Sequence, residues 1–158
     1  MTESEPAGDV AGVIALPPFI YAAAILAAFV LQLLWPLVPP VSTPMRWVAG
    51  VGVVLAIGIS IAGRGAFERA GTNVNPMLPA KQLVVSGVYR RTRNPMYVGM
   101  AIACTALAVA TRNGWLLIAL VPVQVVMHWG VILREERYLS RTFGADYDAY
   151  RRSVRRYL

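Results

Sequence analysis

The sequence predicts an all-α integral membrane protein with about four transmembrane helices, a structured cytoplasmic connector and a C-terminal amphipathic helix. Of the 158 residues, 57% are hydrophobic, above the about 45–50% that is usual for globular domains. Four long segments carry no charged side chain, and the charged residues are concentrated between and after these segments. The chain length suits one domain, so we treat residues 1–158 as a single membrane domain.

The first predicted span covers residues 16–38, which contain 23 uncharged residues. That length is sufficient for a helix to cross a hydrocarbon layer of about 30 Å. Glu3, Glu5 and Asp9 precede the span, and no Lys or Arg accompanies them. Because a secretory signal begins with a basic segment, we expect a retained transmembrane helix rather than a removable signal.

The second predicted span, residues 47–63, has 17 uncharged residues, which is the lower limit for crossing a membrane. Gly52, Ala56 and Ser60 recur at every fourth position. Small residues at this spacing allow two helices to approach closely in a bilayer, so this face should pack against another helix. The glycine-lined span also permits a homodimer.

The third and fourth predicted spans, residues 95–111 and 114–133, form a helical hairpin with a tight turn at Arg112. Proline is favoured in the first turn of a helix and asparagine at the N-cap, so Asn94-Pro95 should begin the third span. Cys104 is the single cysteine, which leaves no partner for a disulfide or a cysteine-pair metal site. We expect it to be a small buried apolar residue.

Positive charge is distributed unevenly along the chain. Of the 15 Lys and Arg residues, 13 lie in the connector, residues 64–94, or after the fourth span, and only Arg46 and Arg112 do not. This bias predicts that the connector and both termini are cytoplasmic, in the inner membrane if the protein is bacterial. The net charge of +7 then favours contact with anionic membrane lipids and gives no reason to expect nucleic-acid binding.

The connector is the segment in which a functional site is most expected. It is too long for a simple turn, and its apolar residues and turn-forming prolines and asparagines indicate ordered structure. Its end, "GVYRRTRNPMY", sets Arg93 beside the N-terminus of the third span. A guanidinium next to unpaired helix amides suits a carboxylate or a phosphate. The alternative is an interfacial anchor in which the arginines and tyrosines contact lipid headgroups.

Two adjacent carboxylates, Glu135 and Glu136, lie at the predicted membrane boundary where the fourth span ends. Acidic residues at that depth are costly unless they are paired or functional. The third span begins at the boundary where the fourth ends, so Arg93 and the two glutamates should be neighbours. Such a site suits a zwitterionic or sulfonium ligand. The alternative is a solvated cluster of salt bridges with Arg93, Arg134 or Arg137.

Residues 134–158 are predicted to be an amphipathic segment. From Phe143 onward one helix face collects the apolar residues Phe143, Tyr147, Tyr150, Val154 and Leu158. This segment suits a helix in the membrane interface, or a lid over the polar site. His128 lies in the fourth span, where buried polar packing is a better interpretation than catalysis, and no second histidine is present for a metal pair.

Together, "AGTNVNP", "LVVSGVYRRTRNPMYVG", "REERYL" and "FGADYDAY" resemble the isoprenylcysteine carboxyl methyltransferase family, which is related to the phospholipid N-methyltransferases. The resemblance covers about residues 69–158. It implies a bacterial-type membrane enzyme that uses S-adenosylmethionine at the cytoplasmic face to methylate a carboxylate, a thiol or a lipid-like acceptor. Asn94 stands where many members have histidine, and the sequence stops before the proline-containing tail of the eukaryotic enzymes. The first departure argues against a base at this position, and the second leaves open whether the acceptor is a prenylated protein, a thiol, a small carboxylate or a lipid headgroup.

The resemblance also implies roles for individual residues. The cofactor-binding residues would be Tyr89, Arg93, Asn94, Pro95, Tyr97 and Glu135. The candidate catalytic residues are Glu136 and Arg134, of which Arg134 would position an anionic acceptor. Two other functional classes remain open from the sequence: an NADPH-dependent membrane reductase with a similar helical arrangement, and a non-catalytic four-helix membrane protein.

Overall fold

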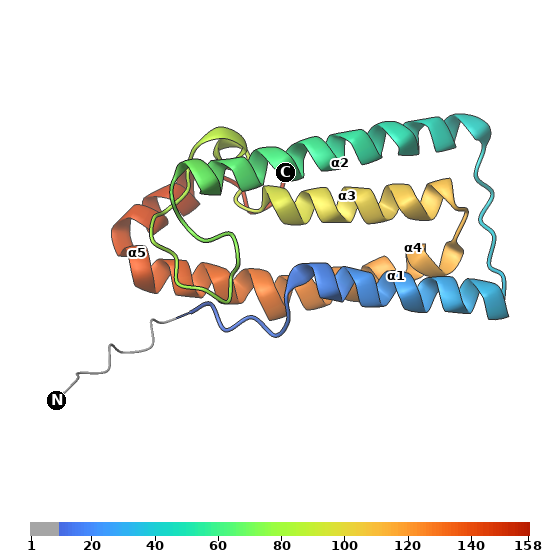
Figure 1. The fold of residues 1–158 in the computed structure, drawn as a ribbon, viewed down its shortest axis with the longest axis horizontal. Helices are drawn as coiled ribbons and strands as arrows, with labels where there is room; N and C mark the ends of the chain where they lie inside the picture. Colours follow the sequence, from blue (N-terminus) through green and yellow to red (C-terminus); the bar gives the residue numbers. More distant parts are fainter. Residues whose placement is uncertain (1–9) are drawn as a thin grey trace.

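The computed structural model describes residues 10–158, which form helices joined by short links and one long connector (Figure 1). In chain order the elements are α1 (Pro17–Leu34), α2 (Thr43–Arg69), the 3₁₀ helix η1 (Gly87–Arg90), α3 (Pro95–Ala110), α4 (Gly114–Val126), the π-helix η2 (Met127–Ile132) and α5 (Leu133–Ser153). No strand occurs among the described residues, and the predicted all-α class is confirmed. Glu3, Glu5 and Asp9, on which the expectation of a retained first span depends, lie outside them.

Within residues 10–158, three helical segments are long and apolar enough to cross a membrane: α1, α2 and the continuous run Gly114–Ser153 that joins α4, η2 and α5. The third predicted span corresponds to α3, which is also apolar but shorter, at 16 residues. Large apolar side chains such as Phe19, Leu33 and Val121 are exposed on the outside of these helices. Extensive exposed apolar surface of this kind marks a membrane interaction, and the protein is an integral membrane protein.

Several predicted helix boundaries are corrected by the structure. α1 ends at Leu34 rather than at residue 38, because Pro36 disfavours helical geometry in the residue before it. α2 is longer than the predicted 47–63 at both ends. At its C-terminal end Arg64 Nε donates to Glu68 Oε1 over 2.8 Å, and this pair, one turn apart, supports the helix beyond its apolar part. The connector is therefore residues 70–94 rather than 64–94.

α2 and α3 lie side by side and are closely packed (Figure 1). A Cβ added at Gly99 of α3 would lie 2.6 Å from Ser60 Oγ and 3.1 Å from the Ala56 carbonyl oxygen. A Cβ added at Gly52 would lie 3.5 Å from the Cβ of Ala106. The small-residue repeat of α2 therefore packs against α3, as the sequence predicts.

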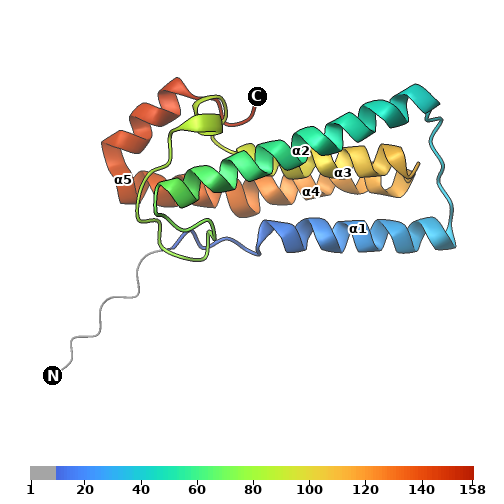
Figure 2. The same cartoon turned by 45° about the horizontal axis from the view of Figure 1, so that its top comes forward.

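The two short links of the bundle lie at the end opposite to the connector (Figures 1 and 2). There Gly114 N donates to the Leu37 carbonyl over 2.8 Å, so the α3–α4 turn contacts the α1–α2 link. The buried Asn113 caps α4, because its side chain accepts a hydrogen bond from Leu116 N. Arg46 and Arg112 belong to this end, whereas the connector and α5 lie at the other.

α5 is bent at Gly144, whose φ of 51° and ψ of −122° are not helical (Figure 2). Residues other than glycine rarely adopt this backbone conformation. The helix ends at Ser153, so the predicted amphipathic helix does not continue to residue 158. Val154 is extended, and the last residues return to the start of α3, where their carbonyl groups accept hydrogen bonds.

Candidate functional site

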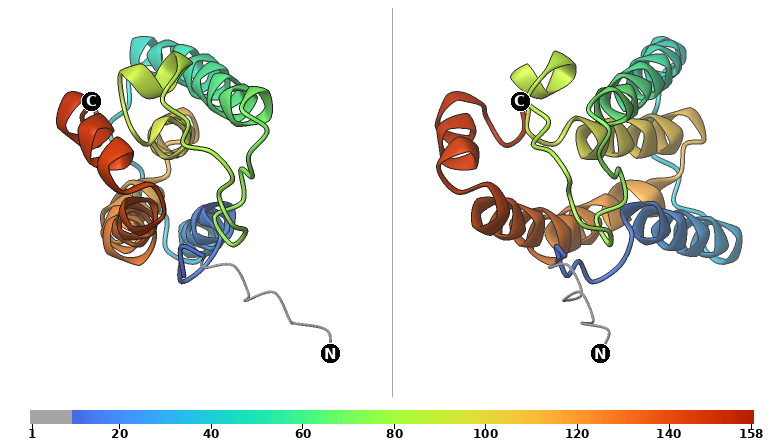
Figure 3. Two further views of the ribbon diagram at one scale, coloured as in Figure 1. Left: turned by 90° about the vertical axis from the view of Figure 1, so that its left-hand side faces the viewer. Right: turned by 60° about the vertical axis from the view of Figure 1, so that its left-hand side comes forward.

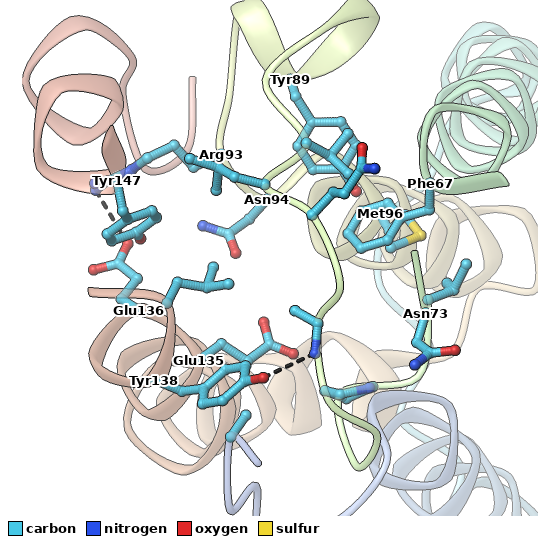
Figure 4. Close-up of a pocket in the computed structure, with 18 of the residues that line it drawn as sticks. Phe67, Asn73, Tyr89, Arg93, Asn94, Met96, Glu135, Glu136, Tyr138 and Tyr147 are labelled. Carbon is cyan, nitrogen blue, oxygen red and sulfur yellow. Dashed lines mark hydrogen bonds and ion pairs between the residues drawn. The ribbon is translucent and has the colours of Figure 1, made fainter. Parts of the chain in front are cut away.

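The connector, the start of α3 and α5 meet at one end of the bundle (Figure 3). A pocket lies between them (Figure 4). Its space, counted with its open mouth, is about 850 Å³. Among the residues that line it are six of the eight predicted from the sequence: Tyr89, Arg93, Asn94, Tyr97, Glu135 and Glu136.

The other two predicted residues do not line the pocket. Pro95 is buried in the first turn of α3, where its ring suits the helix start. Arg134 is exposed, and its Nη1 donates to the Gly12 carbonyl over 2.8 Å. The structure therefore separates Arg134 from the glutamate pair that follows it in the sequence.

The start of α3 agrees with the prediction in position but not in its cap. Asn94 precedes Pro95 as expected, yet its side chain makes no capping hydrogen bond to the helix. Its Nδ2 instead donates to the Arg156 carbonyl over 2.9 Å, and its backbone N–H donates to Thr92 Oγ1 over 3.2 Å. The asparagine side chain thus joins the start of α3 to the C-terminal residues.

Arg93 is the most unusual polar residue of the pocket. Its side chain is 8% exposed, and its Nη2 lies 3.1 Å from Glu136 Oε1. Nε and Nη1 are buried and have no hydrogen-bond partner among the described residues. A buried donor without a partner costs about 1–3 kcal/mol, and more when it is charged. These two donors are therefore suited to an anionic ligand group.

Glu136 belongs to a cluster with two arginines. Its oxygens accept hydrogen bonds from Arg156, with Nε at 2.9 Å from Oε1 and Nη2 at 2.8 Å from Oε2. Hydrogen bonding to this carboxylate raises the pKa of Arg156 above its ordinary value. Glu136 therefore pairs with Arg93, as the salt-bridge alternative expects, and with Arg156 in place of Arg134 or Arg137, but its pair with Arg93 is buried rather than solvated.

Glu135 has a different environment although it is the next residue. Its Oε1 accepts a hydrogen bond from the Tyr97 hydroxyl over 2.5 Å. Figure 4 shows its carboxylate directed toward the open centre of the pocket, away from the cluster that contains Arg93 and Glu136. A carboxylate in that position can accept hydrogen bonds from an ammonium or a hydroxyl group of a ligand.

Aromatic residues form much of the remaining wall. Tyr89 is buried and packs edge-on against Phe67, with ring centroids 5.4 Å apart. Burial raises the pKa of Tyr89 well above its ordinary value, and the Glu135 carboxylate adds to this shift. The phenol is therefore neutral at physiological pH. The Tyr138 hydroxyl accepts a hydrogen bond from Ala80 N over 2.8 Å, which fixes the connector against α5.

Sequence reasoning did not assign Phe67, Tyr138 or Arg156 to the site. The predicted connector includes Phe67, but no motif singles out that residue, and a helical tail would not bring Arg156 back to the start of α3. Tyr147 and Tyr150 were identified only as part of an apolar helix face. Both line the pocket, because the bend at Gly144 turns the second half of α5 toward it.

Comparison with known proteins identifies the family of the chain. The family model for phospholipid methyltransferases matches residues 44–146, which is more than half of the sequence and includes both glutamates and Arg93. No curated protein and no solved structure gave a match. The match confirms the resemblance at the family level and favours a methyltransferase over the reductase and non-catalytic alternatives. The chain belongs to the phospholipid methyltransferase family and is a membrane methyltransferase.

Proposed function

We propose that this protein transfers the methyl group of S-adenosylmethionine to a carboxylate, a thiol or a lipid-like acceptor at the cytoplasmic face of the membrane. The family supplies the reaction class. The observation that carries the choice of methyl donor is the buried guanidinium of Arg93, which has two donors without partners in a pocket that also contains the Glu135 carboxylate.

The polar groups of the pocket match the two charged ends of an amino acid moiety. Arg93 would hold the carboxylate of the methyl donor through its unpartnered donors Nε and Nη1, because hydrogen bonds between a charged guanidinium and a carboxylate are strong. Glu135 would hold the ammonium group or the ribose hydroxyls. The aromatic wall of Phe67 and Tyr89 would pack against the adenine.

The donor's sulfonium supplies a methyl group that is already activated for in-line displacement. The residues of the protein therefore contribute mainly orientation and the exclusion of water. Leu78, Met96 and Leu139 add apolar surface to the lining.

Asn94 does not titrate, so a group other than Asn94 would have to accept any proton that the acceptor loses. Glu136 is held by two arginines and serves better to orient them than to act as a base.

Ligand-dependent stability of the detergent-purified protein tests this proposal. S-adenosylmethionine and its demethylated product should raise the unfolding temperature, because a ligand at 100 times its Kd stabilises the folded state by about 2.7 kcal/mol. Arg93→Gln should abolish the shift. Arg90→Gln is the matched control, because Arg90 is an exposed arginine of the neighbouring η1.

Two results would contradict the proposal. A shift with NADPH alone would indicate a different cofactor class. A full shift in the Arg93→Gln variant would show that the methyl donor binds elsewhere.

A further inference from the structure

The last five residues, 154–158, form a C-terminal strap that binds the segment before α3. Arg93 N donates to the Arg155 carbonyl over 2.9 Å. The Arg156 carbonyl accepts two hydrogen bonds, one from Thr92 Oγ1 over 3.1 Å and one from Asn94 Nδ2 over 2.9 Å. Two consecutive carbonyl groups of the strap thus hold three consecutive residues, of which Arg93 and Asn94 line the pocket.

The strap is also attached at its end. The Tyr157 hydroxyl lies 2.6 Å from His128 Nδ1, and His128 belongs to η2. The strap therefore joins three separate elements, which are the second half of α5, the connector and the π-helix. This arrangement gives His128 a structural partner outside the pocket.

The side chain of Arg156 makes the shorter hydrogen bonds to the carboxylate of Glu136. Its Nε and Nη2 bind the two carboxylate oxygens over 2.9 and 2.8 Å, whereas Arg93 makes one longer contact of 3.1 Å to Oε1. Two-point pairing between a guanidinium and a carboxylate is stronger and more directional than a single contact. Glu136 is therefore bound chiefly by Arg156 and only in part by Arg93.

This division leaves Nε and Nη1 of Arg93 without partners among the described residues. If Arg156 were absent, Glu136 Oε2 would lose its partner, and Oε1 would keep only its contact with the buried Arg93 guanidinium. Arg93 would then form the two-point pair itself, because an unmatched buried charge is costly. That pair would use Nη2 together with Nε or Nη1, so at least one of the donors that now lack partners would be consumed within the protein.

We propose that Arg156 is a positioning residue of the ligand site: by occupying Glu136, it keeps two donors of Arg93 available for the carboxylate of the ligand. The inference rests on the proposed function, which supplies that carboxylate through the methyl donor. Arg156 acts through Glu136 and Arg93 and needs no contact with the ligand.

The test compares the affinity for S-adenosylhomocysteine in single and double variants by isothermal titration calorimetry. Arg156→Ala should weaken binding roughly ten-fold or more, equivalent to about 1.4 kcal/mol or more. Arg152→Ala removes the same charge from an exposed position of α5 and should change the affinity less than about two-fold, as expected for a screened surface charge. Arg156→Lys retains the charge without two-point pairing and should give an intermediate loss.

The double variant Arg156→Ala/Glu136→Gln separates positioning from a general structural role. The uncharged amide introduced by Glu136→Gln binds a guanidinium more weakly than the carboxylate does, so Arg93 should be released to the ligand. The double variant should therefore bind S-adenosylhomocysteine more tightly than Arg156→Ala alone. Wild-type affinity in Arg156→Ala and Arg156→Lys, or weaker binding in the double variant than in Arg156→Ala, would overturn the proposal.

Hydrogen–deuterium exchange in the absence of ligand distinguishes failure of this inference from failure of the proposed function. Loss of the Arg156–Glu136 pair should speed exchange at residues 92–94, where Arg93 N is bonded to the strap. If the wild-type protein does not bind S-adenosylhomocysteine, the proposed function fails. Unchanged exchange at residues 92–94 in Arg156→Ala would instead overturn the role of Arg156.

Discussion

Glu135 and Glu136 are adjacent in the sequence but occupy different electrostatic environments. Glu136 has a side chain that is 9% exposed and is bonded to two arginines, whereas Glu135 accepts a hydrogen bond from a neutral tyrosine. Consecutive helix residues point in directions about 100° apart, which places one glutamate toward the arginine cluster and the other toward the centre of the pocket. One carboxylate therefore stabilises the wall, and the other is available to a ligand.

Substitution of each glutamate by glutamine should separate these roles. Glu135→Gln should weaken binding of S-adenosylhomocysteine about ten-fold with little change in unfolding temperature, because it removes a carboxyl group that faces the ligand. Glu136→Gln should lower the free energy of unfolding by roughly 1–3 kcal/mol, since it leaves buried arginine donors poorly matched. Calorimetric binding and thermal unfolding of both variants provide the measurement. Equal effects on stability would contradict the division.

Arg134 is the predicted catalytic residue that the structure leaves outside the pocket lining, bonded to the Gly12 carbonyl. If it positions an anionic acceptor, Arg134→Ala should raise the KM for the acceptor several-fold and leave the affinity for S-adenosylhomocysteine unchanged. Arg137→Ala is the matched control, because Arg137 is also exposed and its Nε donates to a carbonyl of its own helix. Equal KM values in the two variants would remove Arg134 from the mechanism.

The pair α2 and α3 shows how helix packing supports the site. Gly63 of α2 lies where an added Cβ would be 2.8 Å from Met96 Cγ and 3.7 Å from the Tyr89 hydroxyl. Both Met96 and Tyr89 line the pocket. Small residues in α2 thus allow α3 and η1 to approach closely enough to form this wall, in a bilayer where lipid provides little hydrophobic drive for helix association.

Enlarging Gly99 should disrupt this packing. Gly99→Ala brings a methyl group against Ser60 Oγ and the backbone carbonyl of Ala56, and overpacking of this kind costs about 1–3 kcal/mol. Gly58→Ala is the control in the facing helix, because an added Cβ there meets nothing within 4 Å. Unfolding in mixed detergent micelles measures both. A Gly99→Ala protein as stable as the Gly58→Ala protein would contradict the observed packing.

The molecule as a whole has a strongly asymmetric charge distribution along the bundle. The connector, the pocket and the C-terminal strap lie at one end with most of the arginines, and the end with the short links holds Arg46 and Arg112. Such asymmetry orients a membrane protein with its positive end in the cytoplasm. We therefore expect the pocket to draw its water-soluble methyl donor from the cytoplasm.

Cysteine labelling in intact cells tests this orientation. In a Cys104→Ala background, Ser42→Cys marks the link end and Ser153→Cys marks the end of α5, and both serines are exposed. A membrane-impermeant maleimide should label position 42 in intact cells and position 153 only after the cells are opened. The reverse pattern would invert the predicted topology.

Local features of the chain were predicted well where a single residue or a short pattern decides the outcome. Pro95 sets the start of α3, and the repeat of Gly52, Ala56 and Ser60 marks the packed face of α2. The extent of α2 was underestimated, because helix formation continues through charged residues that do not belong in a hydrocarbon layer. The continuation of the tail as a helix was also wrong, since Val154 and Leu158 fit the helical period but the strap bonds elsewhere.

The sequence by itself determined that this protein is helical, lies in a membrane and places a polar site beside the third and fourth spans. These properties follow from hydrophobicity, charge and residue preferences, which act over one turn or one span. Only the tertiary structure decided which charges are paired. Arg156 reaches Glu136 because α5 bends at Gly144 and the strap returns to the start of α3. Whether a buried charge is neutralised or available depends on such three-dimensional contacts, because electrostatic pairing acts over a few ångströms regardless of distance along the chain.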